Sequence, residues 1–187
     1  RIGNGNTIFP GAVIGAIPQD LKFRGEESTA EIGDNNLIRE NVTINRGTAA
    51  KGKTCVGSGN LLMESVHVAH DAFVGNDCII GNGTKLAGEI IIDDHAIISA
   101  NVLMHQFCRV GGYTMVGGGT RFSQDIPPYT ICAREPVAYC GLNLVGLRRR
   151  GFSNELIENI HNAYRIIYQG GVPSVSYTHL RAHETRS

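Results

Sequence analysis

The chain has 187 residues, enough for one domain with a hydrophobic core and a small appendage. Its 17 lysines and arginines balance 17 aspartates and glutamates, so no overall charge favours nucleic acid or an acidic membrane as a partner. No apolar run approaches the roughly 18 residues of a transmembrane segment. The five cysteines are odd in number and form no CxxC pair, which argues against a disulfide framework and a zinc knuckle and favours a reducing, cytoplasmic compartment.

The first elements in the chain are apolar residues spaced six apart, at Ile2, Ile8 and Ile14. A period of six matches neither a helix nor a long two-residue alternation, but it suits a short strand followed by a corner. This is the hexapeptide repeat of a parallel β-helix. The next two positions in this register are Asp20 and Glu26, which cannot face a dry core. The sequence therefore predicts a loop over residues 16–31.

The spacing of six resumes after this loop and then continues without a miss. Ile32, Ile38 and Ile44 restore it, and a second loop is predicted at residues 46–54, which are rich in Gly and Lys. Every sixth residue is then apolar at Val56, Leu62, Val68, Val74, Ile80, Leu86, Ile92, Ile98, Met104, Val110, Val116 and Phe122. Three hexads should make one triangular coil of about 18 residues. We expect the β-helix to span residues 1–128, because Pro127 and Pro128 would interrupt a strand ladder.

The last part of the chain shows a different pattern. A junction is expected from residue 129 to about Gly151, and a helix is predicted from Ser153, which can cap it. Leu156, Ile157, Ile160, Tyr164 and Ile167 lie on one face of that helix at three- and four-residue steps, and Gly170, Gly171 and Pro173 should end it. Residues 129–173 thus form the junction and a helix. Residues 174–187 follow neither pattern, and we expect them to be a non-native tail.

One column of this predicted coil carries chemistry. His70, Gly88 and Gln106 each lie two residues after a core position, so three successive coils should stack them at about 4.8 Å per rung. An imidazole beside a bare backbone suits acyl transfer, because the ring can take a proton from an attacking hydroxyl while a backbone N–H stabilises the oxyanion. A surface histidine is more often simply solvated, and Gly88 could only shape a corner. Asp71 could pair with His70 only if a corner intervenes, because adjacent strand residues face opposite sides.

Six stretches of the sequence carry a family resemblance. They are LLMESVHVAHDAFVG (Leu61–Gly75), IPQDLKFRGE (Ile17–Glu26), IRENVTINRGT (Ile38–Thr48), MHQFCRVG (Met104–Gly111), QDIPPY (Gln124–Tyr129) and GLRRRGFS (Gly146–Ser153). These stretches resemble the UDP-N-acetylglucosamine O-acyltransferases of lipid A biosynthesis (LpxA-type), and the resemblance runs from Ile2 to about Gly170. It implies an all-β fold, a left-handed parallel β-helix, with a C-terminal helical domain of which only the first helix is expected here. It also implies a homotrimer with active sites between subunits.

The resemblance also implies an activity and the residues that perform it. A 3-hydroxyacyl group would pass from the thioester of acyl carrier protein to the 3-position of UDP-N-acetylglucosamine, the first step of lipid A biosynthesis, with no metal or cofactor. His70 would be the general base, Gly88 the oxyanion donor and Asp71 the acidic neighbour of the base. The substrate contacts implied are His67, Gln19, Asp20 and Lys22 for the sugar nucleotide, His105 and Gln106 beside the substrates, and Asn143, Arg149 and Arg150 for the nucleotide or carrier phosphate. Gly118 matches the position that sets acyl-chain depth.

Glu89 departs from the pattern, since better-known relatives carry histidine directly after the oxyanion glycine. A carboxylate would repel a diphosphate unless it points away or binds a cation, and it would favour an amine on the acceptor sugar. Our hypothesis is that Glu89, counted among the substrate contacts, tunes the choice of acceptor.

Two other classes remain open from the sequence. A γ-type carbonic anhydrase holds zinc with three histidines on the same fold, and the interval from His70 to His105 would suit two of them. The third ligand is missing, because residue 110 is valine and His95 lies on a different face. The other class is a non-catalytic hexapeptide-repeat scaffold, for which the column of His70, Gly88 and Gln106 would be accidental.

Overall fold

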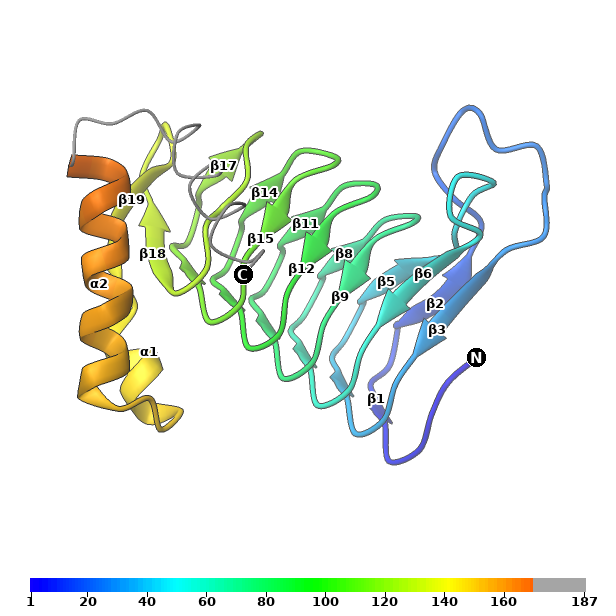
Figure 1. The fold of residues 1–187 in the computed structure, drawn as a ribbon. Helices are drawn as coiled ribbons and strands as arrows, with labels where there is room; N and C mark the ends of the chain where they lie inside the picture. The colour runs from blue at the N-terminus through cyan, green and yellow to red at the C-terminus, as the bar shows by residue number, and fades with distance from the viewer. Residues whose placement is uncertain (170–187) are drawn as a thin grey trace, which may run out of the picture. The chain divides into compact units, whose positions relative to one another are not determined.

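The computed structural model describes residues 1–169, which divide into two compact units between Asn143 and Leu144. The first unit is built from short strands in three sheets (Figure 1). One sheet contains β1 (Thr7–Ile8), β4 (Leu37–Ile38), β7 (Leu61–Leu62), β10 (Ile79–Ile80), β13 (Ile97–Ile98), β16 (Met115–Val116), β18 (Thr130–Ala133) and β19 (Ala138–Leu142). The second contains β2 (Val13–Ala16), β5 (Thr43–Asn45), β8 (His67–Val68), β11 (Lys85–Leu86), β14 (Leu103–Met104) and β17 (Arg121–Phe122). The third contains β3 (Thr29–Ile32), β6 (Lys53–Val56), β9 (Phe73–Val74), β12 (Ile91–Ile92) and β15 (Arg109–Val110).

Each of the first five coils contributes one strand to each sheet, and the sixth contributes β16 and β17 and an isolated bridge from Ile126 to Val110. All strand pairs are parallel except β18 with β19. Leu62 pairs with Ile80 and Ile80 with Ile98, so one coil takes the expected 18 residues. The predicted parallel β-helix of hexapeptide repeats is therefore confirmed.

The interior of the coil is the apolar column found in the sequence. All twelve residues from Val56 to Phe122 in that register are buried, with exposed fractions between 0% and 7%. A second inward row lies two residues earlier in each hexad, where Val66, Ala72, Ile90, Ala96 and Val102 are also buried. The core is therefore a narrow stack of aliphatic side chains that runs along the coil axis and fixes the register of every strand.

The corners recur with the same period of six. The residues at positions 71, 77, 83, 89, 95, 101, 107, 113 and 119 all have a positive φ, the left-handed conformation that glycine, asparagine and aspartate adopt most readily. Asp71 has a φ of 60° and Glu89 also has a φ of 60°. A corner therefore does follow His70, which is the condition under which Asp71 can turn its carboxylate back towards the imidazole.

The two predicted loops are shorter than the sequence suggested. The loop expected at 16–31 covers only residues 17–28, and the loop expected at 46–54 covers only residues 46–52. The reason is that β3 and β6 pair with each other over four residues, from Thr29 with Lys53 to Ile32 with Val56. The hexad register alone marks only two residues of each strand, so it could not show this longer pairing.

The β-helix also continues past the two prolines, which corrects the boundary expected at residue 128. Ile126 forms a bridge with Val110, and β18 pairs with β16 through Met115 and Ile131. The prolines lie between these contacts, and the Pro127 carbonyl accepts hydrogen bonds from the hydroxyls of Thr114 and Thr130. Gly111 makes room for Pro128, because a Cβ at Gly111 would lie 2.4 Å from the Pro128 nitrogen.

The described part of the second unit, up to Gln169, contains two helices, α1 (Leu144–Arg149) and α2 (Asn154–Gln169). The predicted helix after Ser153 is confirmed, and the Ser153 hydroxyl accepts a hydrogen bond from the Leu156 N–H at 3.1 Å, as an N-cap does. The junction contains α1 and the β18–β19 hairpin, neither of which the sequence predicted. Gly170, Gly171, Pro173 and the proposed tail lie outside the described residues. Within residues 1–169, no helix is long and apolar enough to cross a membrane.

Candidate active site

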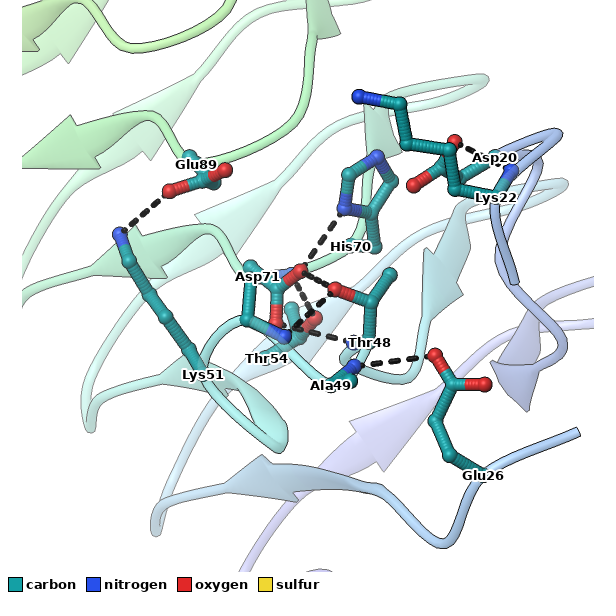
Figure 2. Close-up of polar contacts among 11 residues, drawn as sticks. Asp20, Lys22, Glu26, Thr48, Ala49, Lys51, Thr54, His70, Asp71 and Glu89 are labelled. Carbon is teal, nitrogen blue, oxygen red and sulfur yellow. Dashed lines mark hydrogen bonds and ion pairs between the residues drawn. The ribbon is translucent and has the colours of Figure 1, made fainter. Parts of the chain in front are cut away.

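His70 and Asp71 form a side-chain pair at the corner between β8 and β9 (Figure 2). His70 Nδ1 lies 2.9 Å from Asp71 Oδ2. Because an ionised carboxylate can only accept a hydrogen bond, Nδ1 carries the proton and Nε2 keeps its lone pair in the neutral ring. The pair therefore fixes the tautomer that a general base needs.

The Asp71 carboxylate is buried, with 0% of its side chain exposed. Thr48 donates to it twice, from its N–H to Oδ1 at 3.0 Å and from its hydroxyl to Oδ2 at 2.6 Å. Burial alone would favour the neutral acid, but the hydrogen bonds from Thr48 and His70 hold the pKa of Asp71 below its usual value. The carboxylate is therefore charged at neutral pH although water does not reach it.

Gly88 lies directly against the His70 ring, as the 18-residue spacing predicted. A Cβ on Gly88 would lie 2.6 Å from Cε1 and 2.7 Å from Nε2 of His70, so this position has no room for a side chain. The Gly88 carbonyl accepts a hydrogen bond from Phe107 at 3.1 Å, but within residues 1–169 its N–H donates to no protein group. A base nitrogen and a free backbone donor therefore lie beside each other.

A groove of about 320 Å³ opens over this pair. Its lining includes His70, Gly88, His67, Lys85 and Gln19. His67, Lys85 and Leu103 are neighbours in one outward-facing row of the second sheet, where Lys85 pairs with both of the others. The groove thus combines a base, a cation and apolar surface, which suits a ligand with both a charged and an aliphatic part.

His67 is held as a neutral side chain. Its Nδ1 lies 2.7 Å from the Thr43 hydroxyl. Burial, together with the nearby charge of Lys85 and with His70, lowers the pKa of His67 below its usual value. Neutral His67 can accept or donate a hydrogen bond to a ligand in the groove.

The loop at 17–28 supplies three of the predicted substrate contacts, Gln19, Asp20 and Lys22. Gln19 lines the groove with His70. Asp20 shapes the loop, because its carboxylate accepts a hydrogen bond from the Lys22 N–H at 3.0 Å. The structure thus brings Gln19 to the groove and keeps Asp20 and Lys22 on the same short turn.

Glu89 forms an ion pair with Lys51, whose Nζ lies 3.6 Å from Oε2 (Figure 2). The sequence left open whether this carboxylate would point away from a diphosphate or bind a cation. Lys51 in the loop at 46–52 is that cation. The charge of Glu89 is therefore partly balanced within the protein before any ligand arrives.

A second groove, of about 450 Å³, adjoins the first, and both are lined by Leu103 and Met104. His105 lines it together with Arg121, Gln124 and Glu135. Gln106 lies outside both linings and is exposed. A Cβ at Gly118, the position predicted to set acyl-chain depth, would lie 3.3 Å from the Ala100 carbonyl oxygen, so only a small shift would admit a methyl group there.

The three residues predicted for a distal phosphate pocket belong to different units. Asn143, at the end of the first unit, is buried and donates from Nδ2 to the Tyr113 carbonyl at 3.0 Å. Arg149 is the last residue of α1 and Arg150 follows it, with the Arg150 N–H bound to the Leu147 carbonyl at 3.1 Å. Their joint role in a pocket stays a prediction.

Two residues at the site were missed by the sequence analysis. Lys85 could have been found, because it lies 18 residues after His67 and therefore in the same outward row. Thr48 could not, because it belongs to an inserted loop that has no place in the hexad register. Within residues 1–169, no three His, Cys, Asp or Glu side chains come together to hold a metal ion.

The comparisons with known proteins agree on one family. Residues 125–182 match the family model described as "Udp N-acetylglucosamine O-acyltransferase; Domain 2". The chain is 48% identical over 173 residues to the acyl-[acyl-carrier-protein]--UDP-N-acetylglucosamine O-acyltransferase of Synechocystis sp., an alignment that covers 92% of this chain. The chain spans 63% of that relative's length.

Solved structures give the same result. A UDP-N-acetylglucosamine acyltransferase (LpxA) from Bacteroides fragilis is 78% identical, with a TM-score of 0.92, and the match covers 97% of this chain and 72% of that one. LpxA from Acinetobacter baumannii is 42% identical, with a TM-score of 0.90, over 94% of this chain and 69% of that one. These matches confirm the predicted fold class, a left-handed parallel β-helix.

Proposed function

Since the chain belongs to the UDP-N-acetylglucosamine O-acyltransferase family, we propose that it transfers a 3-hydroxyacyl group from the thioester of acyl carrier protein to the 3-hydroxyl of UDP-N-acetylglucosamine. This is the first step of lipid A biosynthesis. The observation that carries the proposal is the contact of His70 with Gly88, in which a base nitrogen and a free backbone N–H meet in one groove.

The reaction follows from these two groups. His70 Nε2 removes the proton of the sugar 3-hydroxyl while its Nδ1–H stays bound to Asp71. The sugar oxygen forms a bond to the thioester carbonyl carbon, and the Gly88 N–H donates to the resulting oxyanion. When the intermediate collapses, the C–S bond breaks and the leaving thiolate takes the proton from Nε2. The buried Asp71 carboxylate stabilises the imidazolium that exists between these two proton transfers.

The proposed substrates divide between the two grooves and the loop. Gln19, His67 and Lys85 line the first groove and would hold the sugar nucleotide, the lysine through its phosphates. Asp20 and Lys22 would contact the same ligand from the loop at 17–28. The second groove, lined by His105 and the Leu103 and Met104 side chains, would take part of the acyl chain. Gln106, which lines neither groove, would lie beside the substrates, and Gly118 would set the depth that the acyl chain reaches. Asn143, Arg149 and Arg150 would bind the nucleotide or carrier phosphate.

Assembly and location complete the proposal. We propose a homotrimer that places the groove between subunits, which fits the exposure of large apolar side chains such as Phe73, Leu103 and Phe107 on the first unit. All five cysteines are free thiols, which fits a reducing, cytoplasmic compartment. A γ-type carbonic anhydrase is not favoured by the relatives, and neither is a scaffold without activity.

The test is an assay of the purified protein with UDP-N-acetylglucosamine and a 3-hydroxyacyl carrier protein, with the ester product measured by mass spectrometry. His70→Ala should lower kcat by about 10²–10⁴-fold, the usual contribution of a general base. The matched control is His161→Ala, because His161 is an exposed histidine on α2 and should leave turnover unchanged. No transfer to the sugar nucleotide by the wild-type protein would contradict the proposal. So would full activity of His70→Ala, which would exclude the base assigned here.

A further inference from the structure

The loop at 46–52 is inserted into the β-helix directly beside the His70–Asp71 pair. It adds residues between two coils: the spacing from Ile38 to its partner Leu62 is 24 residues, whereas later coils take 18. An insertion that only lengthened the surface would need no contact with the pair. This one contributes Thr48, which is buried and faces Asp71 (Figure 2).

Thr48 supplies two of the hydrogen bonds that hold the Asp71 carboxylate. Its N–H binds Oδ1 at 3.0 Å and its hydroxyl binds Oδ2 at 2.6 Å. Oδ2 is also the oxygen that lies 2.9 Å from His70 Nδ1. The Thr48 hydroxyl and His70 Nδ1 thus bind the same carboxylate oxygen. The hydroxyl therefore helps to determine where Oδ2 lies and how the imidazole is oriented.

The loop that carries Thr48 is itself fixed on two sides. The Glu26 carboxylate accepts a hydrogen bond from the Ala49 N–H at 3.0 Å and, through its other oxygen, one from the Arg24 N–H at 2.8 Å. Lys51 pairs with Glu89 on the corner that follows Gly88. The loop is therefore tied both to the segment that carries Gln19, Asp20 and Lys22 and to the corner beside the oxyanion donor.

We propose that Thr48 is a positioning residue for His70, which acts through Asp71 by holding its carboxylate in the orientation that keeps the proton on His70 Nδ1. This inference rests on the proposed acyltransferase function. Thr48 does not touch the reacting atoms, and its effect is on the tautomer and direction of the base. Loss of its hydroxyl should therefore lower kcat and leave the KM values for both substrates near those of the wild type.

The variants separate positioning from simple loss of stability. Thr48→Val removes the hydroxyl donor and keeps the shape and the backbone N–H, and we expect kcat to fall about 10- to 100-fold, as for other groups that orient a reacting side chain. Thr48→Ser keeps a hydroxyl donor at this position, so its kcat should stay within about threefold of the wild-type value. The matched control is Thr114→Val, because Thr114 is also buried and its hydroxyl donates to the Pro127 carbonyl, far along the chain from the pair. If Thr48→Val fails to fold, Thr48→Ala is measured in its place.

A measurement that does not depend on turnover separates the test of the Thr48 role from the test of the acyltransferase function. The ¹⁵N shifts of the His70 ring report its tautomer, which should be protonated at Nδ1 in the wild type and redistributed in Thr48→Val but not in Thr114→Val. Suppose that the wild-type protein transfers acyl groups but Thr48→Val matches Thr114→Val in kcat and in the His70 tautomer. The positioning role proposed for Thr48 is then wrong, and the proposed acyltransferase function is unaffected. If the wild type transfers nothing, the function is wrong, and an unchanged tautomer in Thr48→Val would still overturn the positioning role.

Discussion

At the scale of single residues, the site depends on a carboxylate that stays charged without water. Asp71 is buried, and the donors that replace its hydration are Thr48 and His70. Desolvation and hydrogen bonding act in opposite directions on its pKa, and the hydrogen bonds prevail. The pair can therefore be tested through stability as well as through activity.

Asp71→Asn should reveal this charge in the pH dependence of unfolding. Because folding lowers the pKa of Asp71, the stabilisation is fully present above the unfolded value of about 3.9 and is lost as the pH falls through the folded value. We expect the variant to lose roughly 1–3 kcal/mol at pH 7, the cost of unsatisfied buried donors. Denaturant unfolding at several pH values measures this. The difference from the wild type should shrink as the pH falls below about 4; a difference that stays unchanged at lower pH would contradict the account.

His67 makes a prediction of the same sign in a higher pH window. Folding lowers its pKa as well, so here too the unfolded chain binds the proton more tightly. The wild type should therefore lose stability relative to His67→Gln as the pH falls from about 6.5 towards the lower folded value, with no divergence above about 7.5. Thermal unfolding of both proteins from about pH 5 to 8 tests this, and parallel curves would show that His67 is not buried as a neutral ring.

At the scale of elements, buried asparagines tie one coil to the next. The Asn60 side chain accepts from the Cys78 N–H at 2.8 Å and donates to the Gly75 carbonyl at 2.9 Å, and the Asn60 N–H donates to the Asn36 side chain at 2.9 Å. Asn60 is only 1% exposed, so water could not replace these bonds. This polar ladder runs inside an otherwise aliphatic core.

Asn60→Ala should lower the free energy of unfolding by about 2–4 kcal/mol, because it leaves a buried N–H and a buried carbonyl without partners. The matched control is Asn82→Ala, since Asn82 is exposed at a turn and its substitution should change stability by less than about 0.5 kcal/mol. Denaturant titration measures both. Equal effects of the two variants would mean that the buried asparagine ladder does not hold the coils together.

The elements also show which features local sequence can and cannot predict. The apolar register and the 18-residue column were visible, because each repeats with a fixed period, and they located His70 against Gly88 correctly. The four-residue pairing of β3 with β6 was not visible, because it depends on two segments brought together by an inserted loop. The six-residue helix α1 is too short to show a period. Thr48 carries no periodic signal at all.

At the scale of the whole molecule, one rule places residues far apart in sequence into one groove. The coils repeat one pattern of strands and corners, so residues 18 apart in the sequence become neighbours in space. The insertions at 17–28 and 46–52 interrupt this rule, and they supply Gln19 and Thr48 to the site. The regular coil thus brings His70 and Gly88 together, the proposed base and oxyanion donor, while the irregular loops provide contacts around them.

The proposed trimer gives a further prediction at this scale. Large apolar side chains such as Phe73, Leu103 and Phe107 are 45–62% exposed on the first unit, and a partner subunit would cover them. Light scattering at micromolar concentration should therefore give three times the chain mass of 20.1 kDa. A single-chain mass would contradict the proposed trimer.

The central claim is that His70 Nε2 faces the acceptor oxygen while the Gly88 N–H faces the thioester carbonyl. A crystal structure with bound UDP-N-acetylglucosamine tests it most directly, through the distance from Nε2 to the sugar 3-oxygen. We predict hydrogen-bond contact at about 2.6–3.2 Å, with the sugar in the groove beside His67 and Gln19. A sugar nucleotide bound elsewhere, with its 3-oxygen out of reach of His70, would contradict the account.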